Sequence, residues 1–412
     1  MTYSPRRATL LPALAVAVLL TSATACSGRS DAANSGITDD KVTIGTTVPL
    51  SGPASVYSGS AYAAKALFDT LNDQGGVPFG DGKKRKIELV ISDDQLDPSR
   101  ALTAVRGLAE KDQVFAVFGQ WSSGVTDATR DYLNQKKIPQ ILVNAPSTHV
   151  SAETDKYPWT QGFSPTATLE TKVAAQLFQQ LKPKAKIGVL YPQNAGGDEV
   201  VSGIEEEVRG TSMKVVTKQG YQATAPTVDS QMANLRGSGA DVFINYGTAP
   251  IAAQAIKAVH ELGWEPVHYV AQSSSGVETT LKPAGTGISK GIYSTAYLKD
   301  PSHPRWSDDK DVRRYIEVVS KADLDPNDMI VQQGYTEAEA LIAAFAQMKE
   351  PTREELMRVM HSLDEVELGM LLPGITLSTS DDDPFLIDDL QVVRFNGTRY
   401  EPVGGVVSGG AE

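Results

Sequence analysis

The stretch that decides the fold is KVTIGTTVPLSGPASVYSGSAYAAKALFDTLNDQGG, residues 41–76. Its first part, Val42–Val48, is short, apolar and rich in β-branched residues, which is typical of a buried strand. Pro49–Pro53 ends this strand, and Ala61–Leu71 then shows the apolar spacing of an amphipathic helix that stops before a pair of glycines. The stretch therefore predicts a strand, a loop and a helix, the repeating unit of a parallel sheet covered by helices.

The same alternation continues along the chain and restarts after a break at Tyr157–Pro165. Short apolar runs, each followed by a polar loop and an amphipathic stretch, lie at 87–91, 114–118, 138–143, 186–190, 241–245 and 267–270. After about residue 290 three helical stretches follow, which we expect to return to the first half, and a late strand near Leu390–Phe395, which we expect to join the second. The pattern predicts an α/β protein with two lobes.

The N-terminus has the form of a secretion signal. Arg6 and Arg7 precede the apolar run Ala8–Leu20, which is too short to span a membrane, and small residues lead to Cys26, the only cysteine of the chain. We therefore interpret residues 1–25 as a lipoprotein signal peptide and Cys26 as a lipidation site, so that the protein would be extracytoplasmic and held at the cell membrane by a lipid anchor alone. Plain secretion with an unmodified Cys26 is the alternative. Residues 26–40 are small and polar, which predicts a flexible tether.

The composition excludes several classes of function. The 412 residues carry 50 acidic and 38 basic side chains, for a formal charge of -12, which argues against a nucleic-acid partner. A single cysteine excludes an intramolecular disulfide, and the five histidines lack the spacing of a metalloprotease motif. We expect no metal and no cofactor.

The loops that follow the expected strands are rich in Ser, Thr and Gly, and ligands of open parallel sheets bind beyond the carboxyl ends of the strands. These side chains suit a carboxylate or another small polar group, although each could merely cap a helix. Motifs for phosphate loops, dinucleotide binding and the hydrolase nucleophile elbow are absent from the sequence. We therefore expect a binding protein that is not an enzyme. A secreted hydrolase that uses the Ser273–Ser275 run is the less favoured alternative.

Several of these stretches together resemble one known family. They are Thr46–Pro53, the helix end Asn72–Gly76, Ser92–Gln95 with Asp97 and Pro98, Phe118–Gly119 with Ser122 and Ser123, and Asn144–Thr148. As a set they resemble the solute-binding proteins of branched-chain amino acid ABC transporters, which have the type I periplasmic-binding fold. The resemblance covers about residues 41–400 and is strongest over 41–150.

The resemblance implies two Rossmann-like lobes that are joined by three crossovers and close on a solute. The first lobe would hold residues 41–163 and 299–373, the second 164–298 and 374–404, with a tail at 405–412. It also implies a monomer that delivers a small solute to the permease subunits of an ABC importer. A ligand-sensing receptor of the same fold, which signals through another membrane protein, is the alternative.

Site residues carry over one by one from the resemblance. Tyr57 matches a pocket aromatic, while the hydroxyls of Ser123 and Thr148 match those that hold a ligand carboxylate, with the backbone N–H of Ser147 beside them. Trp121 lies next to Ser123 in sequence and either lines the pocket or is an ordinary buried aromatic.

The second lobe departs from the family pattern. Ser273 stands where amino-acid-binding members have an acidic residue for the ligand ammonium, and Gly196 stands where they have a closing aromatic. A second aromatic position falls at Thr248 or Ala249. We therefore expect a small carboxylate or amide with an aliphatic or aromatic group in preference to leucine, isoleucine or valine.

Overall fold

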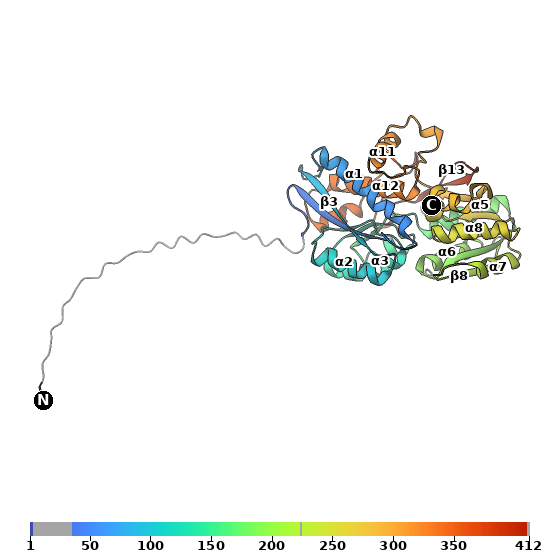
Figure 1. Cartoon of the computed structure of the whole chain (residues 1–412), viewed down its shortest axis with the longest axis horizontal. Coiled ribbons are helices and arrows are strands. Elements are labelled where there is room, and N and C mark those ends of the chain that lie inside the picture. Colours follow the sequence, from blue (N-terminus) through green and yellow to red (C-terminus); the bar gives the residue numbers. More distant parts are fainter. Residues whose placement is uncertain (3–34, 223–224, 410–412) are drawn as a thin grey trace.

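The computed structural model describes residues 1–2, 35–222 and 225–409 as two lobes that lie side by side (Figure 1). Each lobe is an open sheet covered by helices, and the chain passes between the lobes three times, near residues 163, 298 and 373. The predicted α/β fold with two Rossmann-like lobes is confirmed.

The sheet of the first lobe has six strands in the order β2-β3-β1-β4-β5-β6, all parallel except β2. The first-lobe elements before the first crossover are β1 (Lys41–Val48), α1 (Gly59–Asp73), β2 (Val77–Pro78), β3 (Lys84–Asp93), α2 (Pro98–Glu110), β4 (Val117–Phe118), α3 (Ser123–Lys136), β5 (Gln140–Val143), α4 (His149–Ala152) and β6 (Thr160–Gly162). The unit predicted from residues 41–76 is thus β1 and α1, at the centre of this sheet.

Local sequence explains where these helices begin. Asp97 caps α2 by accepting the N–H of Arg100, and Pro98 occupies the first turn, where its missing N–H removes no hydrogen bond. Ser122 precedes α3 with a φ of 84°, a conformation that few residues other than glycine adopt. This turn brings Ser123 to the start of α3, at the carboxyl edge of the sheet.

The sheet of the second lobe has seven strands in the order β13-β12-β11-β10-β9-β7-β8. Its elements are α5 (Ala167–Leu181), β7 (Lys186–Pro192), α6 (Ala195–Glu207), β8 (Lys214–Tyr221), α7 (Asp229–Gly237), β9 (Val242–Asn245), α8 (Ala249–Glu261), β10 (Val267–Val270), α9 (Lys282–Ala284), α10 (Thr286–Ser289), β11 (Tyr293–Ala296), β12 (Asp389–Phe395) and β13 (Tyr400–Ser408). The last two strands are antiparallel to β11 and to each other.

Three helices lie between the second and third crossovers and belong to the first lobe: α11 (Lys310–Lys321), α12 (Met329–Gln347) and α13 (Arg353–Met360). The helix α12 packs closely against α1, because Gly334 has no side chain where the backbone of Ser60 approaches. A Cβ at position 334 would lie 2.0 Å from the carbonyl oxygen of Ser60, so only glycine permits this distance between the helices.

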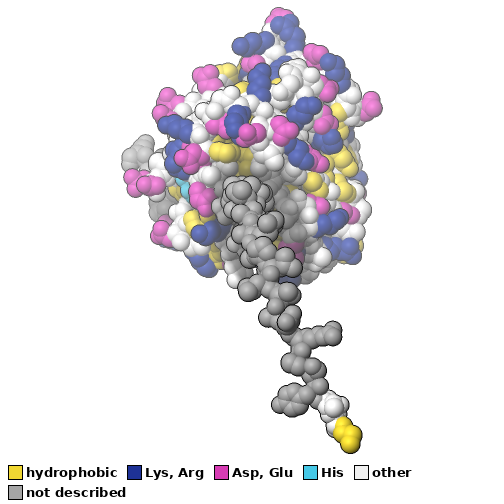
Figure 2. All heavy atoms as spheres, turned by 90° about the vertical axis from the view of Figure 1, so that its left-hand side faces the viewer, with side chains coloured by type: hydrophobic (Ala, Val, Ile, Leu, Met, Phe, Trp, Pro, Cys, Tyr) yellow, Lys and Arg dark blue, Asp and Glu magenta, His cyan; other side chains and the backbone are white. Residues whose placement is uncertain are grey.

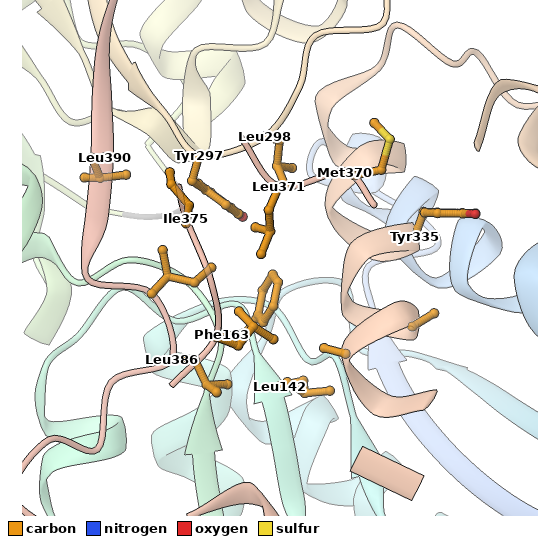
Figure 3. Close-up of a cluster of buried hydrophobic side chains, with 14 of the residues drawn as sticks. Leu142, Phe163, Tyr297, Leu298, Tyr335, Met370, Leu371, Ile375, Leu386 and Leu390 are labelled. Atoms are coloured by element: carbon orange, nitrogen blue, oxygen red, sulfur yellow. The ribbon is translucent and has the colours of Figure 1, made fainter. Parts of the chain in front are cut away.

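The three crossovers share one apolar cluster, which Figure 3 shows. Phe163 from the first, Tyr297 and Leu298 from the second, and Leu371 from the third are all buried there. The rings of Phe163 and Tyr297 lie 6.3 Å apart in an edge-to-face arrangement. The hinge between the lobes therefore has an apolar interior.

Two predicted boundaries are wrong. The end of the expected tether, residues 35–40, packs on the first lobe: the Thr38 carbonyl accepts the Nε–H of Arg85 at 2.6 Å, and Ile37 bridges Val42. The expected tail at 405–412 begins later, because β13 runs to Ser408 and pairs with β12. The signal segment and Cys26 lie outside the described residues.

Among the described residues, no helix is both long and apolar enough to cross a membrane. On the first-lobe face in Figure 2, basic and acidic side chains intermingle and form no basic patch among the atoms described there. This surface is consistent with the net negative charge of the chain.

Candidate functional site

A cavity of about 300 Å³ lies between the lobes, where loops from the carboxyl ends of both sheets meet. The first lobe contributes Tyr57, Leu96, Pro98, Trp121, Ser122, Ser123, Gly124, Asn144, Pro146 and Gln333, the first crossover contributes Ser164, and the second lobe contributes Pro192, Gln193, Asn194, Gly196, Tyr246, Gly247, Thr248, Ser273 and Ser274. Five of the seven residues predicted to bind the ligand, Tyr57, Trp121, Ser123, Thr248 and Ser273, thus line one cavity, whereas Ser147 and Thr148 do not.

Two aromatic rings form the apolar wall of the first lobe. Tyr57 and Trp121 lie 4.7 Å apart between ring centroids, and both are about 5% exposed. The indole N–H of Trp121 donates to the hydroxyl of Ser60 at 2.8 Å, which fixes the orientation of the ring. The Tyr57 hydroxyl accepts the N–H of Ala249 from the second lobe at 3.1 Å, so this wall also contacts the second lobe directly.

Backbone hydrogen bonds hold the two hydroxyl-bearing loops of the first lobe together. The N–H of Ser122 donates to the carbonyl of Asn144, and the N–H of Asn144 donates to the carbonyl of Gln120. This pairing brings the Ser147 hydroxyl to 2.7 Å from the Ser123 hydroxyl, to which it donates. The Ser123 hydroxyl at the cavity can therefore donate its own proton to an acceptor on a ligand.

Thr148 departs from the prediction, because its side chain does not line the cavity. Its hydroxyl lies 2.9 Å from that of Thr168, at the start of α5, and its backbone N–H donates to Glu199 on α6 at 2.6 Å. Both partners belong to the second lobe, so Thr148 helps to hold the lobes together. Sequence reasoning placed Thr148 in the correct loop but could not include its contacts with the other lobe.

His149 extends this contact between the lobes. Its Nε2 lies 2.7 Å from a carboxylate oxygen of Asp127 in the first lobe, and its Nδ1 lies 3.2 Å from Glu199. These two carboxylates raise the pKa of His149 to about 9, and Asp127 has the larger effect. Burial and the nearby Arg130 act in the opposite direction. At neutral pH His149 is therefore a cation between two acidic side chains.

Raising the pH from 7 to 10 is expected to remove the contribution of His149 to stability. The pKa of the folded state, about 9, lies above the usual value of 6.5, so the stabilisation is complete below about pH 6.5 and is lost as the pH rises through about 9. Because His149 and its two carboxylate partners are partly exposed, solvent weakens their attraction. We therefore expect His149→Gln to lower the melting temperature by only about 1–3 °C at pH 7. Calorimetry should show this difference vanishing near pH 10. A difference that stays constant across this range would contradict the ionic contribution.

The second lobe contributes small and uncharged groups. Thr248 precedes α8, and its N–H donates to the hydroxyl of Tyr221 at 2.9 Å, which orders the loop after β9. Ser273 and Ser274 belong to the 3₁₀ turn η3 (Gln272–Ser274) that follows β10. Gly196, in the first turn of α6, faces the first lobe so closely that a Cβ would lie 3.2 Å from the Ser147 hydroxyl and 3.3 Å from that of Ser123.

No charged side chain is present among the described residues that line the cavity. Two buried carboxyls lie behind its wall: Glu170 accepts from the Tyr269 hydroxyl and from the N–H of Gln272, and Glu337 contacts Asn144. Burial raises the pKa of Glu170 to about 7 and that of Glu337 well above its usual range. Sequence reasoning missed both, because single glutamates in amphipathic helices carry no distinguishing pattern.

Other cavity residues were missed for similar reasons. Gln193, Asn194 and Tyr246 follow strands of the second lobe and could have been found only by position, as residues of strand-end loops. The described residues contain no group of three or more His, Cys, Asp or Glu side chains placed to hold a metal ion. The site therefore offers hydrogen-bonding groups and aromatic surface.

Comparison with known proteins agrees with this arrangement. The family model described as "Periplasmic binding protein" matches residues 41–399. The Leu/Ile/Val-binding protein homolog 7 of Brucella abortus (strain 2308) is 24% identical over 270 residues, which are 63% of this chain and 64% of that relative. The aligned part thus spans less than two thirds of the relative's length.

Solved structures share the fold at low sequence identity. A branched chain amino acid ABC transporter protein from Thermus thermophilus with bound valine has a TM-score of 0.77 at 15% identity, over 90% of this chain and 97% of its own. A fatty acid ABC transporter substrate-binding protein from Thermomonospora curvata has a TM-score of 0.77 at 20% identity, over 91% and 94%. The chain therefore belongs to the periplasmic binding protein family and has the type I fold of its branched-chain amino acid-type members.

Proposed function

We propose that this protein is an extracytoplasmic solute-binding lipoprotein of an ABC importer, which captures a small solute between its two lobes. The observation that carries this proposal is the cavity itself, which is formed by strand-end loops of both sheets and has hydrogen bonds between the lobes beside it. Membership in a family of binding proteins supports delivery to permease subunits and favours binding over catalysis. We propose that the protein acts as a monomer.

The lining indicates the chemistry of the solute. A volume of about 300 Å³ suits a small molecule, and the rings of Tyr57 and Trp121 offer a surface for an aliphatic or aromatic group. The Ser123 hydroxyl, supported by Ser147, can hold a carboxylate or an amide. Thr248 and Ser273 supply polar groups from the other lobe. We propose a solute with one apolar group and one carboxylate or amide.

The alternative of a serine hydrolase has less support. Ser273 and Ser274 line the cavity, but the lining residues that the structure describes include no His, Asp or Glu to activate a serine hydroxyl. Hydrolysis of a generic ester or amide substrate by the purified protein would support this alternative.

A ligand-sensing receptor of the same fold is the other alternative, and it would bind a signalling protein of the membrane in place of a permease. Genes for a permease and an ATPase beside the gene for this protein would favour transport over sensing.

Mass spectrometry of gently isolated protein tests the proposed function. We expect one co-purified small molecule, and small-angle scattering should show compaction when that compound is added back to protein freed of it, because the lobes close around the solute. Scattering that does not change with the confirmed compound would contradict capture by closure.

Ser123→Ala is expected to weaken binding of the co-purified solute by about 1–3 kcal/mol, or roughly tenfold to 100-fold, because a buried acceptor loses its donor. Ser202→Ala serves as the control, since Ser202 is an exposed residue of α6 whose hydroxyl donates to the Asp198 carbonyl and does not line the cavity. Titration calorimetry measures both variants. Equal losses in the two would argue against a direct contact with Ser123.

Cys26→Ser is expected to release the protein from the membrane fraction without unfolding it, because we propose that Cys26 carries the only anchor. Fractionation followed by immunoblotting measures the distribution, and circular dichroism of the released protein checks the fold. Retention of the variant in the membrane fraction would contradict lipidation at Cys26.

A further inference from the structure

Glu199 connects the lobes in a way that bears on what the site can bind. It lies on α6 of the second lobe, one turn after Gly196, which faces the Ser123 and Ser147 hydroxyls. One carboxylate oxygen of Glu199 accepts the Thr148 N–H at 2.6 Å, and the other lies 3.2 Å from Nδ1 of His149. Both donors belong to the first lobe, in the loop and turn that continue from Ser147.

These two donors lie beside the cavity, directly after Ser147, whose hydroxyl contacts the cavity-lining hydroxyl of Ser123. The cavity lining holds no cation among the described residues, so a carboxylate at the Ser123 hydroxyl would depend for further donors on neighbouring groups such as the Thr148 N–H and protonated His149. Glu199 already satisfies both. The other charges around His149 are Asp127 and Arg130 on α3, and Glu153, which pairs with Arg130. Two of these three are acidic, so a second carboxylate would meet repulsion.

We propose that Glu199 takes the place of a solute carboxylate, so that the site selects a solute whose polar head is uncharged, such as a primary amide. This inference rests on the proposed function and narrows its choice between carboxylate and amide. The hydroxyl of Ser123 and the side-chain amide of Asn194, whose oxygen also caps α6, supply hydrogen-bonding groups for such a head without fixed charge. The link between the lobes that a solute carboxylate would otherwise provide comes from the chain itself.

The same contact favours closure. Glu199 joins α6 to the Thr148 loop, while the Ala249 N–H joins the second lobe to Tyr57 on the other side of the cavity. The solute therefore lies between two connections that the protein makes directly. Loss of the Glu199 connection should weaken binding of a neutral solute and at the same time free the donors for an acid.

Matched probes test the proposal: isovaleramide against isovalerate, and benzamide against benzoate, by titration calorimetry at pH 7. The wild-type protein should bind the amide of a pair at least tenfold more tightly than the acid. Glu199→Ala leaves the Thr148 N–H and His149 without their acceptor, so the ratio of amide to acid affinity should fall at least tenfold. Glu199→Gln keeps the shape and an acceptor oxygen without the charge, and it should shift the ratio in the same direction.

Glu206→Ala is the matched control, because Glu206 is an exposed residue of the same helix that pairs with Arg209. It should leave the ratio unchanged. An acid bound as tightly as its amide by the wild-type protein, or a ratio unaltered by both Glu199 variants, would overturn the inference. Compaction in small-angle scattering with either member of a pair would still support solute capture, whereas no compaction with any probe would count against the proposed function as well.

Discussion

Leucine, isoleucine and valine are expected to bind at least about 100-fold more weakly than their keto and hydroxy analogues, which have the same side chains and no ammonium group. A buried ammonium without an acidic partner costs about 3 kcal/mol or more, which corresponds to roughly a factor of 100 in affinity. The described lining offers no acidic side chain, and Ser273 and Ser274 are present on the second-lobe wall.

Titration calorimetry with the amino acids and their analogues at pH 7 measures this difference. The carboxylate is common to both sets, so any effect of Glu199 on acids cancels in the comparison. Tight binding of leucine with inert analogues would show that a carboxyl behind the wall, Glu170 or Glu337, turns into the cavity when the ligand is present.

Gly196→Phe is expected to reduce affinity for the co-purified solute more than about 100-fold by preventing closure. Even a Cβ at this position would lie within 3.3 Å of the Ser123 and Ser147 hydroxyls, and an aromatic ring would occupy the space in which the lobes meet. The backbone at Gly196 does not have a positive φ, so the substitution should not strain α6 itself.

Calorimetry and small-angle scattering distinguish this effect from unfolding. We expect Gly196→Phe to keep its secondary structure but to show no compaction with solute, whereas Gly196→Ala, which needs only small hydroxyl shifts, should lose about threefold or less. Ser202→Phe, on an exposed part of the same helix, controls for the added ring. Unimpaired closure of Gly196→Phe would show that the lobes meet differently in solution.

The alternation of strands and helices was sufficient to predict two lobes, because each apolar run and the amphipathic stretch after it specify their structure locally. The strand β13 was missed because its Gly405 and Gly404 lower strand propensity, and its conformation depends on pairing with β12. Residues 35–40 look like a tether in sequence, yet Arg85 and Arg353 in distant segments hold them by hydrogen bonds. Both errors concern contacts between segments far apart in the chain.

In the candidate site, too, features set by local sequence were predictable and features set by distant segments were not. Tyr57, Trp121 and Ser123 follow strands of the first lobe, where position in the βα unit predicts which residues face the carboxyl edge. Thr148 lies in such a loop too, but Glu199 and Thr168 of the other lobe determine what it contacts. The role of a residue at an interface between lobes depends on their relative placement, which periodicity does not encode.

The three crossovers have a mechanical consequence. Because the chain passes between the lobes three times through one shared apolar cluster, the lobes are covalently joined at three neighbouring points. Three connections prevent one lobe from rotating freely relative to the other. The remaining relative motion of the two lobes is therefore mainly hinge bending. Proteolytic cleavage of one connection leaves the other two intact. The two lobes of the cleaved protein should therefore stay together and still open and close.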